Sequence, residues 1–95
     1  MRLDADWMSR ADDRILEYLS EWGPDTPKGM EDDGRVRFSR QHINSRCKKL
    51  VSYRLLVHLG NGVYDVTEKG EQYLAGELDA REIEPKEKRL VLEHE

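Results

Sequence analysis

The dipeptide Asn61-Gly62 constrains the fold more than any other feature of this sequence. Both residue types accept the positive φ angles of a type I′ turn, which joins two antiparallel strands through a two-residue loop. Apolar, β-tolerant residues flank the dipeptide over 55–59 and again over 63–66. We therefore predict a β-hairpin whose turn is Asn61-Gly62.

Two segments before the hairpin have the apolar spacing of amphipathic helices. The first helix is predicted over 10–22, with Ser9 as its N-cap and Asp12 as the capping-box partner. The second is predicted over 40–52, with Ser39 as its N-cap. The apolar face of the second helix has residues at i, i+4, i+7 and i+8, namely Ile43, Cys47, Leu50 and Val51.

Two further helices are predicted from their capping residues. Thr26 followed by Pro27 indicates a short helix of at most two turns, with an irregular stretch after it. Thr67 is the expected N-cap of a helix that follows the hairpin and ends near Leu78. Gly70 lies in the first turns of that helix, where a missing side chain would permit close packing.

The predicted order is helix, short helix, helix, strand, turn, strand, helix. A helix-turn-helix followed by a β-hairpin is the winged-helix arrangement. The fold class is therefore α+β: a winged helix-turn-helix with a three-helix core, a two-stranded wing and a C-terminal helix. The 95 residues suffice for one domain with a modest core. We place an N-terminal leader at 1–8, the winged-helix domain at 9–78 and a charged C-terminal tail at 79–95.

Several classes of function find no support in the residues. No activated-nucleophile motif, Gly-rich phosphate loop or placeable carboxylate pair is present, so we predict no enzyme and no cofactor. The lone cysteine, Cys47, permits no intrachain disulfide and is expected to be a buried apolar residue. His42, His58 and His94 are scattered, which argues against a metal site. Neither a signal peptide nor a membrane-spanning run is expected, and we predict a cytoplasmic protein.

The charge of the chain is distributed unevenly. Its net charge is −4, yet the window 34–64 contains seven basic residues and no Asp or Glu. The rest of the chain has nine basic and twenty acidic residues, a balance of −11. A basic patch on an acidic body is typical of a protein that binds a polyanion.

The outward face of the 40–52 helix combines amide, hydroxyl, imidazole and cationic groups. These groups read base edges and phosphates in the major groove of duplex DNA. The expected DNA-binding residues are Arg37, Ser39, Arg40, Gln41, His42, Asn44, Ser45, Arg46, Lys48, Lys49 and Arg54. We expect the cations among them to form one continuous positive surface. The first half of the helix should contact bases and the later residues the backbone.

Two alternatives stay open at this point. The wing tip, Gly60-Asn61-Gly62, carries no charge, so the hairpin either contacts DNA near His58 or only closes the core. The domain as a whole could also be a protein-interaction module that does not bind DNA. The acid-free window favours DNA, because a protein-docking winged helix does not need one.

Several stretches resemble archaeal winged-helix regulators, in particular the haloarchaeal family related to the phage phi-H repressor. They are Trp7-Met8-Ser9, DDRILE at 12–17, CKKLV at 47–51, Leu55-Leu56 and LGNGVYDVTEKGEQYL at 59–74. The resemblance implies a transcription regulator, and specifically a repressor. Arg54 departs from this resemblance, because such proteins have a glycine at the turn between the 40–52 helix and the first strand of the wing. An arginine at this position must adopt a strained φ or a different turn. The segment 29–35 also matches a regular second helix poorly.

We also expect a homodimer, since one recognition helix contacts too few base pairs to discriminate among genomic sites. Helix 10–22, the leader or the tail is the expected interface. Trp7 and Trp22 bracket that helix. Either both fill the core, or Trp7 forms the interface together with the leader and Leu90-Val91-Leu92 of the tail.

Overall fold

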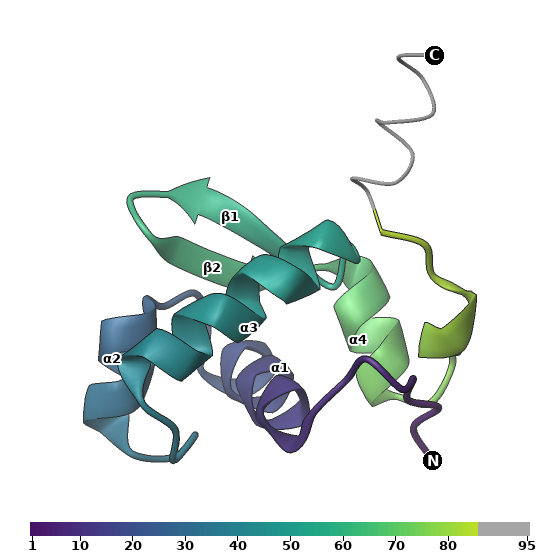
Figure 1. The fold of residues 1–95 in the computed structure, drawn as a ribbon, viewed down its shortest axis with the longest axis horizontal. Coiled ribbons are helices and arrows are strands. Elements are labelled where there is room, and N and C mark those ends of the chain that lie inside the picture. The colour runs from purple at the N-terminus through teal and green to yellow at the C-terminus, as the bar shows by residue number, and fades with distance from the viewer. Residues whose placement is uncertain (86–95) are drawn as a thin grey trace.

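The computed structural model describes residues 1–85. The helices are α1 (Arg10–Trp22), α2 (Pro27–Asp33), α3 (Arg40–Ser52) and α4 (Glu68–Leu74), and a 3₁₀ turn spans Ala80–Glu82. The strands β1 (Leu56–Gly60) and β2 (Val63–Val66) form one antiparallel hairpin between α3 and α4 (Figure 1). The predicted element order is confirmed, and α1 and α3 have the predicted bounds.

The hairpin closes as the turn chemistry requires. Asn61 and Gly62 have φ angles of 54° and 76°, both positive as in a type I′ turn. A third segment joins the sheet, because Asp25 and Tyr64 exchange backbone hydrogen bonds of 3.1 and 2.9 Å. This bridge ties the start of α2 to β2, so it helps to fix the hairpin over the helices.

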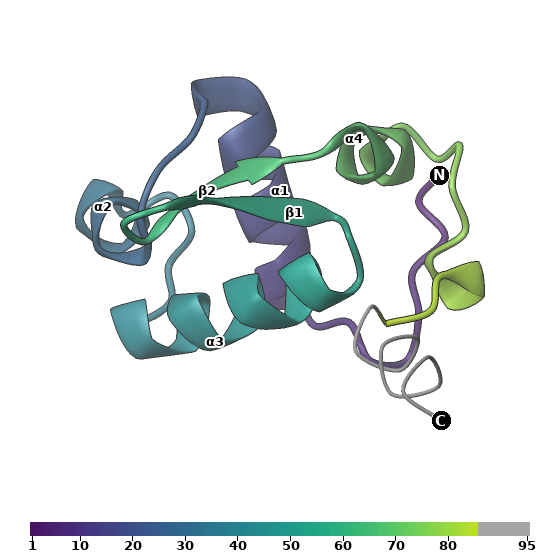
Figure 2. The same ribbon diagram turned by 90° about the horizontal axis from the view of Figure 1, so that it is seen from above.

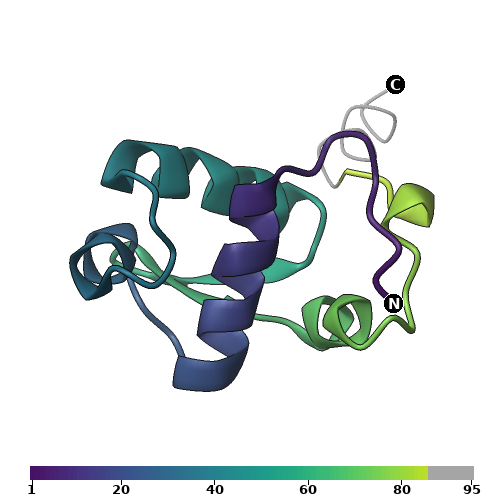
Figure 3. The same ribbon diagram turned by 90° about the horizontal axis from the view of Figure 1, so that it is seen from below.

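The core forms where α1 crosses the other elements. α1 contacts α3, α4 and β2, and it runs through the middle of the molecule in Figure 3. Seen from above, the hairpin lies alongside α3 with its tip near α2 (Figure 2). The largest fully buried side chains come from α1, α2, α3, β1 and α4 and from the segments between elements, and they include Ile15, Leu16, Leu19, Met30, Val36, Ile43, Leu50, Leu55, Leu56 and Tyr73.

α4 ends earlier than predicted, at Leu74 instead of near Leu78. Gly76 takes a φ of 80°, and its N–H donates to the carbonyl of Tyr73. The N–H of Glu77 donates to the carbonyl of Gln72 at 2.8 Å. These two bonds make a Schellman motif, which satisfies the last carbonyls and turns the chain out of the helix.

α2 follows its capping residues. Thr26 Oγ1 accepts a hydrogen bond from the N–H of Gly29 at 3.0 Å, and Pro27 is the first helical residue. Gly34 ends the helix with a φ of 88°. The prediction of a short helix of at most two turns is therefore confirmed, within a segment that matched a regular second helix poorly.

Segments on both sides of the predicted 9–78 domain pack together. Leu3 forms a parallel bridge with Asp79, and its carbonyl accepts the N–H of Ala80 at 2.8 Å. Ala80 is fully buried in the core, and Arg2 Nε donates to the carbonyl of Leu74. The core thus extends into the leader and into the first tail residues. The apolar tail residues Leu90-Val91-Leu92 and His94 lie outside the described residues.

Candidate nucleic-acid interface

α3 is held by its apolar face, as the periodicity predicts. Ile43, Cys47 and Leu50 are fully buried, and Ser39 Oγ accepts a hydrogen bond from the N–H of His42 at 3.2 Å. Burial raises the pKa of the Cys47 thiol to about 12, so Cys47 is a buried apolar group and no thiolate nucleophile at neutral pH. The opposite side of α3 therefore faces outward.

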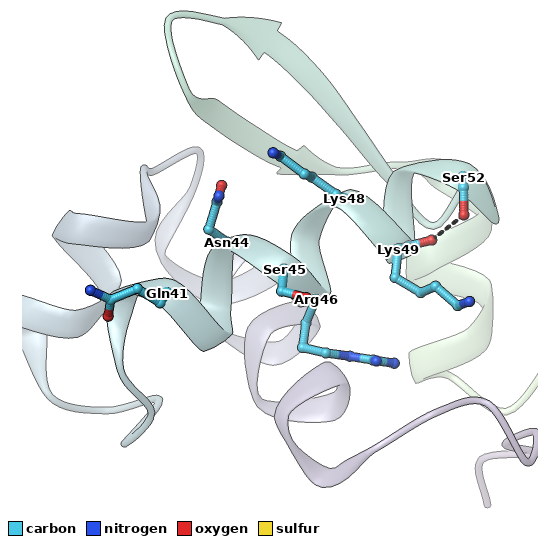
Figure 4. A pocket seen from close by; sticks show the side chains of 7 residues that line it. All are labelled: Gln41, Asn44, Ser45, Arg46, Lys48, Lys49 and Ser52. Carbon is cyan, nitrogen blue, oxygen red and sulfur yellow. Dashed lines mark hydrogen bonds between the residues drawn. The ribbon is translucent and has the colours of Figure 1, made fainter.

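The outward face of α3 borders an open depression of about 610 Å³ (Figure 4). Its lining residues are Gln41, Asn44, Ser45, Arg46, Lys48, Lys49 and Ser52. Six of these seven are predicted contact residues. The seventh, Ser52, turns its hydroxyl to the Lys49 carbonyl at 2.7 Å.

The side chains of this face project in different directions. In Figure 4, Asn44 and Lys48 extend toward the hairpin, whereas Arg46 extends toward α1. Ser45 lies between these two sides, and Gln41 lies nearer the N-terminal end of the helix. The helix thus offers short polar groups along its middle and a lysine on the side of the wing.

A second hollow of about 280 Å³ lies between α3 and the tip of the hairpin. Arg40, Gln41 and Asn44 line it from α3, and Asn61 and Gly62 line it from the wing. The start of α2 closes the hollow with Thr26, Pro27 and Lys28. Sequence reasoning did not assign Lys28 or Asn61 to the site. Only the placement of the hairpin tip over α2 brings them there.

Arg46 differs from the other predicted contact residues because it turns inward. Its Nε donates to Asp12 Oδ1 at 2.8 Å, and its Nη2 donates to Asp12 Oδ2 at 2.7 Å and to the Trp7 carbonyl at 2.9 Å. The hydrogen bond with Asp12 raises the pKa of Arg46, against the opposing effect of burial. The expected continuous positive surface therefore loses the charge of Arg46, which the carboxylate neutralises.

Arg35 is the second basic residue of the window that is already paired. It forms an ion pair with Asp33, and its guanidinium lies 4.3 Å from the ring centroid of Trp22. Within residues 1–85 no ion pair engages the remaining five cations: Arg37, Arg40, Lys48, Lys49 and Arg54. These five are the charges available to a polyanion.

The backbone at Arg54 adopts the strained φ, which is one of the two conformations expected at this position. Arg54 adopts a φ of 66°, the left-handed conformation that glycine accepts without strain. Its carbonyl accepts the Thr67 hydroxyl at 2.7 Å, which links this junction to the start of α4. Arg37 has a similar φ of 68°.

One acidic residue reaches the beginning of α3. Glu31 Oε2 accepts the backbone N–H of Arg40 at 2.9 Å. Glu31 lies just before the acid-free window, so the count of charges along the sequence did not place it here. It adds a negative charge at the end of α3 where base contacts are expected.

The wing carries no charge at its tip, and His58 serves its structure. His58 Nε2 accepts the N–H of Gly62 at 3.1 Å, and its ring lies 4.9 Å from that of Tyr64. Val57 and Leu59 of β1 are exposed. The hydrogen bond shows that His58 stabilises the turn.

The two tryptophans have different surroundings. Trp7 is partly buried against the core and stacks on Tyr53, with ring centroids 3.9 Å apart. Trp22 is 54% exposed at the end of α1. Core packing therefore describes Trp7 but not Trp22.

Neither a cluster of metal ligands nor a helix suited to cross a membrane is found in the part of the chain that the structure describes. There, no three His, Cys, Asp or Glu side chains come together as metal ligands. None of the helices over the same residues has the length and apolar character that a bilayer crossing requires.

The sequence matches a known family of proteins. The family model of the winged helix-turn-helix phage repressors covers residues 1–86. The chain belongs to this family. The repressor protein of Halobacterium phage phiH is 38% identical over 92 residues, which cover 88% of this chain and 98% of that protein.

A solved structure supports the same assignment. The PhiH1 repressor-like protein from Haloarcula marismortui, whose crystal structure is known, shares 46% sequence identity with this chain. The match covers 90% of this chain and 97% of that chain, with a TM-score of 0.84. The expected resemblance to phi-H repressor-like proteins and the winged-helix fold are both confirmed.

Proposed function

We propose that the protein binds duplex DNA sequence-specifically as a transcription repressor, with α3 in the major groove. The observation that carries this proposal is the outward face of α3. Amide, hydroxyl and ammonium groups project there, opposite the buried apolar face. A face of this composition provides both base-edge and phosphate contacts. Membership of the phage repressor family supports the same function.

The proposed contacts divide along α3. Gln41, His42, Asn44 and Ser45 belong to the first half, which contacts base edges in helix-turn-helix docking. Arg40 starts the helix, where it reaches either a base or a phosphate, and Ser39 caps it. The later cations, together with one in the loop before α3, contact the phosphate backbone: Arg37, Lys48, Lys49 and Arg54.

The test needs an operator, which selection from a random-sequence duplex library supplies. Binding isotherms are then measured by fluorescence anisotropy on the selected duplex and on a scrambled duplex of equal composition, at several salt concentrations. Gln41→Ala and Ser45→Ala should each reduce discrimination between the two duplexes by about 1–3 kcal/mol. Affinity for the scrambled duplex should change little.

The lysines should behave differently. Lys48→Ala and Lys49→Ala should weaken binding to both duplexes, and each should lower the slope of log K against log salt by roughly one unit. Lys69→Ala is the matched control, since Lys69 is an exposed lysine of α4 and carries the same charge. It should leave the slope and the discrimination close to those of the wild type.

Two results would contradict the proposal. Altered sequence preference in the lysine variants, with no effect from Gln41→Ala and Ser45→Ala, would show that α3 lies in the groove in another orientation. A wild-type protein that fails to bind any duplex at low salt would instead favour the protein-interaction module.

We further propose that the repressor acts as a homodimer in the cytoplasm. A two-fold dimer doubles the number of contacts and matches a pseudo-palindromic operator. α1, the leader and the tail are the candidate interface elements.

A further inference from the structure

The N-terminal turn of α1 and the middle of α3 are joined by a buried polar junction. It consists of Asp12, Arg46 and the backbone of Trp7 and Ser9. Asp12 is fully buried, and the Arg46 side chain is only 19% exposed. The two side chains come from positions 34 residues apart.

All the hydrogen bonds of the Asp12 carboxylate are formed with members of this junction. Oδ1 accepts Arg46 Nε, and Oδ2 accepts both Arg46 Nη2 and the N–H of Ser9 at 2.9 Å. Arg46 Nη2 also donates to the Trp7 carbonyl. A planar guanidinium can make this two-point contact with a carboxylate, whereas an ammonium group acts as a single point charge.

From this geometry we infer that Arg46 is a positioning residue that fixes α3 against α1, and that it does not contact DNA. The inference rests on the proposed function of α3 as the recognition helix. It removes Arg46 from the contact residues expected from the sequence and gives it a different role in the same site.

The energetics of the buried acid support this role. If Arg46 moved to a phosphate, it would leave Asp12 buried without its counter-charge, which is strongly destabilising. The paired state therefore persists when α3 meets DNA. This largely buried pair is also screened less by salt than the exposed lysines are.

Aromatic packing reinforces the same joint. Trp7 stacks on Tyr53, the residue that follows α3, and Lys49 Nζ lies 5.7 Å from the Tyr53 ring centroid. The segment before α1 is thus attached to α3 at Arg46 and again at Tyr53. Movement of this segment would change the direction in which the outer face of α3 points.

The test compares Arg46→Lys, Arg46→Gln and Asp12→Asn on the selected and scrambled duplexes described above. We expect each variant to lose about tenfold of the discrimination between the two duplexes, comparable to a weak base contact. For Arg46→Gln, the slope of log K against log salt should stay at the wild-type value. The double variant Asp12→Asn/Arg46→Gln, with two neutral amides, should recover part of the lost discrimination.

A phosphate contact gives the opposite pattern. If Arg46 touched DNA, Arg46→Gln would lower the slope by roughly one unit, and Asp12→Asn would free the guanidinium and strengthen binding. Either result would overturn the inference. Lys48→Gln is the control that should show the loss of slope.

A measurement without DNA separates this inference from the proposed function. Amide hydrogen exchange should be faster in α3 of Arg46→Gln than in α3 of the wild type, with exchange in α4 unchanged. If no duplex binds the wild type, the proposed function is wrong, and exchange alone decides whether Arg46 positions α3. Unchanged exchange in α3 would refute the positioning role, and a variant that unfolds is replaced by the double variant.

Discussion

Arg54 has a strained backbone conformation at the junction between α3 and β1. A glycine would adopt the same conformation without strain. A non-glycine residue in the left-handed region costs roughly 1–2 kcal/mol, and Arg54 has a φ of 66°. Glycine recovers this strain but loses about 0.5–1 kcal/mol through its greater freedom in the unfolded chain. We therefore expect Arg54→Gly to stabilise the fold by about 0.5–1 kcal/mol.

The same substitution should weaken DNA binding. Arg54 is one of five cations in the acid-free window without an ion pair among residues 1–85, so its loss should lower the salt slope by roughly one unit. Thermal unfolding followed by circular dichroism at fixed salt gives the stability. The expected rise in Tm is about 2–8 °C for a domain of this size. Anisotropy titrations on the same preparations give the slope.

Two further variants separate charge from strain. Arg54→Asn removes the charge but keeps a side chain that tolerates the left-handed region, so it should lower the slope with a smaller change in Tm. Arg37→Gly tests the same relief of strain at a φ of 68° in another loop. A fall in Tm for Arg54→Gly, or an unchanged salt slope, would refute the corresponding half of the reasoning.

The remaining predictions concern packing and assembly. A Cβ at Gly70 would lie 2.5 Å from the Leu55 carbonyl oxygen and 2.5 Å from Val66 Cγ2, so Gly70→Ala should lower stability by about 1–3 kcal/mol. Chemical unfolding measures this, with Lys69→Ala as a neutral control in the same helix; a stability equal to the wild type would contradict the close approach of α4 to Leu55. Multi-angle light scattering at tens of micromolar should show a dimer, and a monomer both with and without DNA would rule out the proposed assembly.

Much of the fold could be predicted because the signals are local. The bounds of α1 and α3 follow from Ser9 and Ser39 and from apolar spacing, which depend only on neighbouring residues. The turn at Asn61-Gly62 is equally local, since its residues alone accept the required φ angles. The predicted end of α4 was wrong, because the Schellman motif at Gly76 ends the helix at Leu74, whereas the apolar pattern continues to Leu78.

The candidate site could be predicted only in part. Periodicity placed Gln41, Ser45 and Lys48 opposite Ile43, and the structure agrees. The charge count treated all seven basic residues of the window as equivalent. Arg46 follows Ile43 by three residues, so it lies about 60° from it around the helix, at the edge of the buried face. That spacing was the available signal that Arg46 could turn inward.

By itself, the sequence determined which segments become helix or strand, and which face of α3 is buried. These follow from capping residues, turn residues and the spacing of apolar residues, all of which are set by residues a few positions apart. Only the tertiary structure decided that Arg46 pairs with Asp12, that Asp25 extends the sheet at Tyr64, and that Asn61 lies over the start of α2. Each depends on segments far apart in the chain meeting once the core has packed. A local sequence pattern does not predict contacts between residues so far apart in the chain.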